Sequence, residues 1–246
     1  MMAAIKSEFR KLTTTRSTWV FILSTLALCA GLLGFWVFGV KDTAQAAMAG
    51  GGEMALQTFV FAIVGALSLI LSFAAVLSVG HEYRYNTVMY SLVMARSRAQ
   101  VFFAKWLILL VFGLMAGALV IAAGIGTLHL GWSVGDINPV SQNVDWWALS
   151  WRSALAIAGG MTYAYMFTLI VRSQVSAFTL ILLLSSLLES LAGLLLKENV
   201  KYLPYTSLSG LYRDGVDLKQ TVLTVTAYML GLGIIAYVLF RSRDAN

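Results

Sequence analysis

The feature that most constrains this chain is a series of long apolar runs, each about as long as the hydrocarbon core of a bilayer is thick. A membrane-spanning helix needs roughly 20 consecutive, mostly apolar residues. The runs are continuous rather than alternating, which favours helices over membrane strands. Six stretches meet the requirement, at about 18–40, 56–79, 106–130, 151–171, 175–196 and 220–240. The sequence therefore predicts an all-α integral membrane protein with six transmembrane helices.

Composition supports the same class of protein. Of the 246 residues, 59% are hydrophobic and 11% are charged, whereas roughly a quarter of the residues are charged in an ordinary soluble domain. A soluble fold of this length could not bury that much apolar surface, so the excess is expected to face lipid. No stretch has the composition of a soluble domain, and we therefore expect a single transmembrane domain over residues 1–246.

The Lys and Arg residues predict the orientation of the spans. Six spans place both termini on one side of the membrane, and that side carries eleven of the seventeen Lys and Arg residues. Because cytoplasmic loops are enriched in Lys and Arg, we predict that both termini are cytoplasmic. We therefore interpret the net charge of +6 as a signal of membrane topology. The chain has no Lys/Arg run with interleaved aromatic residues, so its sequence does not predict a nucleic-acid partner.

The segment before the first apolar run has the pattern of an interfacial helix. Within residues 4–16, Ile5, Phe9 and Leu12 are spaced to share one helical face, and the cations lie elsewhere around the helix. Such a helix lies in the membrane surface, with its apolar face in lipid and its cations near anionic headgroups. The alternative is a basic flank that only sets the topology.

The longest predicted cytoplasmic loop, residues 80–105, contains a second amphipathic segment. Its apolar helical stripe is made of Val88, Met89, Leu92 and Val93, and charged residues stand at both ends. An exposed apolar stripe needs a covering surface, which favours either a docked protein partner or a helix folded back onto the membrane. The residues alone leave both readings open.

Two short motifs in these segments resemble a known family. The chain opens with Ser7-Glu8-Phe9-Arg10-Lys11, and a spaced pattern follows the second span, made of Glu82, Arg84, Thr87, Ser97, Arg98 and Lys105. Together they resemble the ABC-2 type permeases, the membrane subunits of bacterial ABC exporters. The sequence departs from that pattern where it has Asn86-Thr87, since family members often carry Gly-Thr there.

The resemblance implies a specific assembly. The chain would be the permease subunit of an ATP-driven exporter, paired with an identical or related permease and with separate ATPase subunits. ATP and Mg²⁺ would bind those ATPases, and this chain would bind no cofactor. Residues 4–16 would form the elbow helix, and the segment between the fifth and sixth spans would form short re-entrant helices. The substrate could be an antibiotic, a peptide, a lipid or another hydrophobic compound.

The resemblance also implies that the loop contains a coupling helix, which sits in a cleft of the ATPase. The residues that would couple to the ATPase are Glu82, Arg84, Thr87, Val88, Met89, Leu92, Val93, Arg96, Ser97 and Arg98.

A second candidate site lies in the fifth apolar run, which contains Glu189. A charge near the bilayer centre costs roughly 3 kcal/mol on insertion scales, so such residues are candidates for function. Regular helical spacing would place Ser186, Glu189 and Ser190 on one face. This face could line a substrate pathway; alternatively, the span ends early and Glu189 lies in the outer interface.

Catalytic motifs do not support an enzyme. Two isolated histidines and one cysteine give no metal-ligand cluster, and no Gly-Lys dipeptide is present for a Walker A loop. We therefore expect a non-catalytic membrane subunit without a metal. The alternative function is that of a stand-alone secondary carrier or membrane scaffold, although carriers often show inverted repeats, and no clear repeat is seen here.

Overall fold

The computed structural model describes residues 2–35, 52–94, 97–135, 146–213 and 216–242, and these residues contain helices and no strand. The α-helices are α1 (Met2–Thr14), α2 (Arg16–Gly34), α4 (Gly52–Arg84), α5 (Val88–Met94), α6 (Arg98–Gly135), α7 (Trp146–Val171), α8 (Gln174–Leu182), α9 (Glu189–Leu196), α10 (Pro204–Gly210) and α11 (Leu218–Ser242). A π-helix, η2 (Leu183–Leu188), joins α8 to α9, and a 3₁₀-helix, η3 (Lys197–Tyr202), follows α9.

Five of the described helices are long and apolar enough to cross a membrane, and the number is six if a bent pair counts as one span. That pair is α1 and α2, whose axes differ by 59° at a break near Thr15. The prediction of an all-helical, multi-pass membrane protein is therefore confirmed. The separate short helix α1 matches the predicted segment 4–16, and its place in the membrane surface stays a prediction.

The predicted long loop between the second and third spans is wrong in its extent. Helix α4 continues to Arg84 rather than ending near residue 79, and α6 already begins at Arg98 rather than near residue 106. Only a turn at 85–87 and a short link after Met94 separate the three helices. The turn requires a left-handed residue, and Asn86 has φ of 53°. Asparagine tolerates this conformation better than most residues, which explains how it can replace glycine here.

Helix α7 is the centre of the bundle, and it packs against α4, α6 and α11. Small residues allow α6 and α7 to approach closely. A Cβ at Gly113 would lie 2.9 Å from the Ala158 Cα, and a Cβ at Gly117 would lie 3.0 Å from the Ala154 Cα. Close contact of this kind is how membrane helices gain packing energy without help from the hydrophobic effect.

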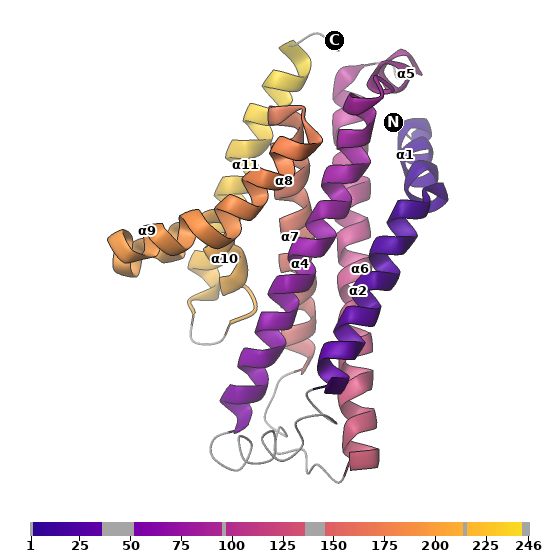
Figure 1. The fold of residues 1–246 in the computed structure, drawn as a ribbon. Helices are drawn as coiled ribbons and strands as arrows, with labels where there is room; N and C mark the ends of the chain where they lie inside the picture. Colours follow the sequence, from indigo (N-terminus) through magenta and orange to yellow (C-terminus); the bar gives the residue numbers. More distant parts are fainter. Residues whose placement is uncertain (1, 36–51, 95–96, 136–145, 214–215, 243–246) are drawn as a thin grey trace.

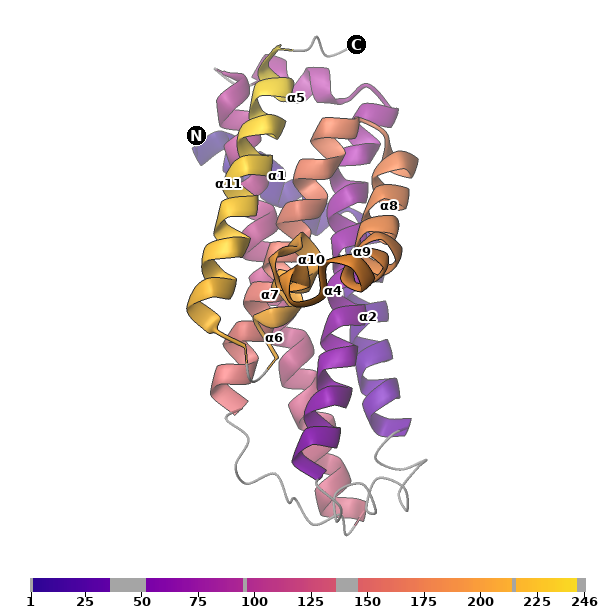
Figure 2. The same ribbon diagram turned by 90° about the vertical axis from the view of Figure 1, so that its left-hand side faces the viewer.

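The chain leaves this regular pattern after α7. Helices α8, η2, α9 and η3 form one continuous segment from Gln174 to Tyr202, and the predicted span 175–196 lies within it. The short helix α10 then packs against α7 and α11 part-way along the bundle rather than at its end (Figures 1 and 2). The last span, α11, agrees with the predicted range 220–240 to within two residues at each end.

The start of α1, helix α5 and the end of α11 all lie at the same end of the bundle (Figure 1). A hydrogen bond supports this arrangement, because Arg98 Nη1 donates to the Arg241 carbonyl oxygen over 3.1 Å. We call this end the α5 end. That it faces the cytoplasm stays a prediction.

Candidate functional site

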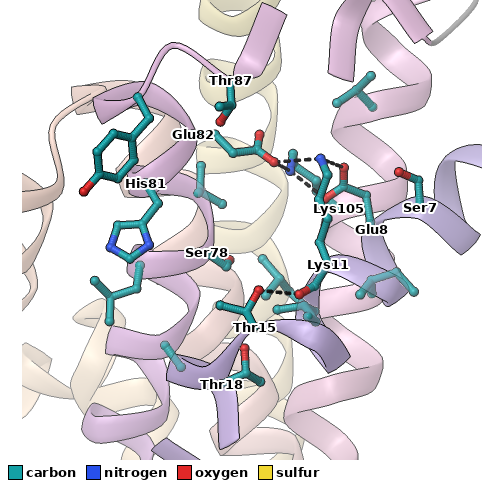
Figure 3. A pocket seen from close by; sticks show the side chains of 18 of the residues that line it. Ser7, Glu8, Lys11, Thr15, Thr18, Ser78, His81, Glu82, Thr87 and Lys105 are labelled. Carbon is teal, nitrogen blue, oxygen red and sulfur yellow. Dashed lines mark hydrogen bonds and ion pairs between the residues drawn. The ribbon is translucent and has the colours of Figure 1, made fainter. Parts of the chain in front are cut away.

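Four charged side chains from three helices meet in one cluster at the α5 end (Figure 3). The Lys105 ammonium on α6 lies 2.6 Å from Glu8 Oε2 on α1 and 2.6 Å from Glu82 Oε1 on α4. The Lys11 ammonium on α1 lies 2.7 Å from Glu8 Oε1 and 2.9 Å from Glu82 Oε1. We call Glu8, Lys11, Glu82 and Lys105 the ion cluster.

The ion cluster is buried and its charges balance. Glu8, Glu82 and Lys105 are each less than a tenth exposed, whereas the Lys11 side chain is 43% exposed. A buried charge is tolerated only when it is paired and hydrogen-bonded, and two carboxylates face two ammonium groups here. The pairing helps α4 and α6 to extend beyond their apolar runs, because Glu82 on one extension and Lys105 on the other form an ion pair inside the bundle.

Glu82 is buried, and its predicted role in coupling to the ATPase stays a prediction. Sequence reasoning assigned Glu82 to the surface that contacts the ATPase, but only 8% of the residue is exposed and its carboxylate points into the bundle. The partners Glu8, Lys11 and Lys105 were not predicted to form a site with it. The sequence feature that could have predicted the ion cluster is the presence of two Glu and two Lys residues close to the predicted ends of spans on the same side of the membrane.

Helix α5 divides the predicted apolar stripe between two faces. Val88 is buried and Leu92 packs against the core, so these two side chains hold α5 on the bundle. Met89 and Val93 point outward, and Val93 is 82% exposed. Tyr90, which sequence reasoning missed, is also exposed. The outer face of α5 is therefore formed by Met89, Tyr90 and Val93.

The predicted coupling residues around α5 have different surroundings. Arg84 and Thr87 are exposed. The Ser97 hydroxyl accepts a hydrogen bond from the Gln100 backbone N–H and so caps the start of α6. Arg98, as described above, is bonded to the end of α11. Arg96 lies outside the described residues.

A cavity of about 390 Å³ lies beside the ion cluster, in the angle between α1 and α2 and against α4 and α6 (Figure 3). Its polar lining includes the ion cluster and seven hydroxyl-bearing residues, and most of its apolar lining comes from α2, α4 and α6. The lining residues are Ala4, Ser7, Glu8, Lys11, Leu12, Thr15, Thr18, Phe21, Ala74, Leu77, Ser78, Val79, His81, Glu82, Tyr85, Thr87, Tyr90, Val101, Lys105, Ile108 and Leu109.

Glu189 is buried and hydrogen-bonded to the start of α10, and its place in a substrate pathway stays a prediction. Its carboxylate accepts hydrogen bonds from the backbone N–H groups of Tyr205 and Thr206, over 2.7 and 2.6 Å, and from the Thr206 hydroxyl over 2.7 Å. These N–H groups belong to the first turn of α10, where a helix has unpaired donors and a partial positive charge. Glu189 therefore holds α10 against the start of α9.

Ser186 and Ser190 do not share the burial of Glu189, and the place of the three residues on a substrate pathway stays a prediction. The two serines are exposed, and their hydroxyls donate to carbonyl groups of their own helix, whereas Glu189 is 6% exposed and turned toward α10. The π-helix Leu183–Leu188 contains the first serine and changes the angular spacing on which the prediction relied.

Among the described residues, no group of three or more His, Cys, Asp or Glu side chains could hold a metal ion. A family model described as "ABC-2 family transporter protein" matches residues 4–188 of the chain. The chain belongs to the ABC-2 transporter family. A comparison with curated proteins gave no match.

Membership of the ABC-2 transporter family makes the chain a multi-pass membrane permease component of an ABC transporter. The matched range includes α1, α5 and the whole ion cluster, and it ends just before Glu189. The motif residues that first suggested the family therefore come together in space: Glu8 and Lys11 from the opening motif contact Glu82 and Lys105 from the second.

Proposed function

We propose that the chain is the permease subunit of an ATP-driven exporter and that the outer face of α5 docks onto a separate ATPase subunit. The observation that carries the proposal is the exposure of Met89, Tyr90 and Val93 on a seven-residue helix between two spans. Three adjacent apolar side chains outside a lipid-facing span favour a protein partner. The α5 end would then be cytoplasmic, in a bacterial inner membrane.

The contacts of α5 support a coupling role. Val88 and Leu92 anchor the helix to the bundle, so a push on its outer face reaches the spans on either side of it. The ion cluster joins the end of α4 to α6 and α1. An ATPase that binds differently in its ATP-bound and ATP-free states would shift these three helices together, because only differential binding changes a conformational equilibrium.

The remaining parts of the assembly follow from the same proposal. ATP and Mg²⁺ would be held by the ATPase, and a second permease, identical or related, would complete the pathway. The exposed leucines of the α8–α9 run, among them Leu187, Leu191 and Leu195, offer an apolar surface for such a copy or for lipid. An antibiotic, a peptide, a lipid or another hydrophobic compound would suit an apolar pathway.

The test is co-purification of the tagged chain with the ATPase, using Val93→Glu against a matched control. Leu92→Glu is a poor test, because Leu92 packs against the core and its loss would disturb the fold. Val93 is almost fully exposed, and Val216 is an exposed valine just before α11. It is the end of α11, not its start, that lies beside α5 (Figure 1).

We expect an ABC ATPase to co-purify with the wild type and with Val216→Glu, and to be lost from a normally folded Val93→Glu. Retention of the ATPase by Val93→Glu would remove α5 as the docking site. Absence of any ATPase from the wild type in several mild detergents would favour a stand-alone carrier or scaffold instead.

A further inference from the structure

The proposed docking of an ATPase does not require a ligand in the cavity beside the ion cluster, although Tyr90 of the outer face of α5 is among the lining residues. At about 390 Å³ it falls within the size range of small-molecule pockets, which is roughly 300–1,000 Å³. It lies between the bend of α1 and α2 on one side and α4 and α6 on the other (Figure 3). An inference about its contents therefore stands or falls separately from the proposed function.

One part of the cavity is polar and electrically balanced. The carboxylates of Glu8 and Glu82 face the ammonium groups of Lys11 and Lys105, so the ion cluster contributes no net charge. Hydroxyl groups lie beside it. The Thr15 hydroxyl donates to the Lys11 carbonyl, and the Ser78 hydroxyl donates to the Ala75 carbonyl. Thr18 lines the cavity as well (Figure 3).

These hydroxyls are suited to a ligand that donates hydrogen bonds. A hydroxyl group that donates its own proton still has lone pairs that accept. The three residues come from both walls of the cavity, Thr15 and Thr18 from the bend and Ser78 from α4. A polar headgroup between these walls could therefore bind to both.

Apart from Ser7, His81, Tyr85, Thr87 and Tyr90, the rest of the lining is apolar. Phe21 from α2, Leu77 from α4, and Ile108 and Leu109 from α6 all contribute to it. These residues belong to the membrane spans, so the apolar part of the cavity continues from the polar part toward the hydrocarbon region. A molecule that fills the cavity must be polar at one end and apolar at the other.

We propose that this cavity binds an amphiphile without net charge, with its polar head beside the ion cluster and its apolar part against Phe21 and Leu77. A headgroup that carried a single charge would leave that charge buried beside a balanced cluster, and an uncompensated buried charge is costly. Two sources offer this chemistry: a zwitterionic phospholipid of the membrane and a soluble, uncharged lipophilic compound.

The proposal can be tested by photolabelling of the full chain in dodecyl maltoside micelles. Three probes carry the same diazirine-bearing octyl chain and differ only in the head, which is a hydroxyl, a carboxylate or an ammonium group. Mass spectrometry then locates the label. We expect the hydroxyl probe to label peptides from 15–21 and 74–82 about tenfold more than either charged probe, because of the cost of the buried charge. Lipid-facing peptides should take up all three probes alike.

A matched pair of variants on α4 controls for position. Ala74 lines the cavity and Ala66 is exposed on the same helix. We expect Ala74→Phe to fill the cavity and to abolish its labelling, and Ala66→Phe to leave the labelling unchanged. Equal labelling of both variants by the hydroxyl probe would overturn the proposal, as would equal labelling of cavity and lipid-facing peptides in the wild type.

A charge variant tests the electrostatic argument directly. Lys11 is the most exposed member of the ion cluster, so Lys11→Met is the replacement least disruptive to the fold. It leaves the lining with a net negative charge, and we expect the preference to move from the hydroxyl probe to the ammonium probe. An unchanged order of the three probes would overturn the proposal.

Addition of phosphatidylethanolamine to the micelles distinguishes the two sources. A fall in cavity labelling by the hydroxyl probe identifies a phospholipid headgroup as an accepted ligand. Labelling that resists the phospholipid but falls with unlabelled octanol identifies the smaller, uncharged compounds. Labelling that resists both competitors is not site-specific and contradicts the proposal.

Discussion

The ion cluster and the Glu189 site both stabilise a buried carboxylate, but they do so with different kinds of partner. Glu82 and Glu189 are carboxylates of similar burial, 8% and 6% exposed, in a protein that is otherwise apolar. Glu82 is compensated by the ammonium groups of Lys11 and Lys105, which belong to two other helices. Glu189 is compensated by the N–H groups and hydroxyl of the first turn of α10, without a cation.

The two sites also differ in which parts of the chain they hold together. The ion cluster joins residues 71 and 97 positions apart, and so fixes α1 against α4 and α6. The Glu189 site joins residues 16 and 17 positions apart, and so fixes one local turn. Loss of one partner should therefore leave a buried charge in the first site, but only unpaired N–H groups in the second.

The largest effect is expected for Lys105→Met. Its removal leaves two buried carboxylates with Lys11 as their remaining ammonium partner, and loss of one partner of a buried pair costs about 3–5 kcal/mol. The free energy of unfolding, measured by SDS titration of the purified protein in mixed micelles, should fall by this amount. The double variant Glu82→Gln with Lys105→Met should recover part of the loss, and a failure to recover any would contradict the pairing.

A smaller effect is expected for Glu189→Gln. The amide keeps one acceptor oxygen but loses the charge, and hydrogen bonds to charged groups contribute roughly 1.5–3 kcal/mol each. Stability should fall by about 2 kcal/mol, and hydrogen exchange should increase in α10 but not in α1. If stability and exchange were unchanged while transport was lost, the carboxylate would instead act in the substrate pathway.

A still smaller loss is expected for Lys11→Met. The Lys11 side chain is 43% exposed, so solvent already screens much of its attraction to the two carboxylates. The same SDS titration should show a loss of at most about 1 kcal/mol. A loss as large as that of Lys105→Met would show that the two lysines are equivalent, and would remove the distinction between the buried and exposed members of the ion cluster.

The smallest effect is expected for Asn86→Gly, in the turn that connects the ion cluster to α5. Asn86 has a positive φ, which glycine adopts at no steric cost. Stability should rise by about 0.5 kcal/mol, because the strain of a left-handed Asn is small. Asn86→Ala serves as the control and should lower stability, since alanine has neither the freedom of glycine nor the tolerance of asparagine.

The sequence by itself determined the helical, multi-pass class and the family. The length and continuity of an apolar run are local properties, so runs such as 151–171 and 220–240 predicted α7 and α11 closely. The family motifs are local too, and Glu82 and Lys105 could be recognised without knowledge of what they contact. Span ends were less predictable, because Glu82, near the end of α4, is paired with lysines of two other helices that the sequence does not place beside it.

Only the tertiary structure decided what each polar or half-buried side chain does. Val88 and Val93 belong to one apolar pattern, yet the first is buried and the second exposed, because only one side of α5 meets the bundle. Glu189 was a charge without a partner in the sequence, and its partners are backbone groups of a helix that forms later in the chain. Burial and pairing depend on residues brought together by folding, and such contacts leave no periodic trace in the sequence.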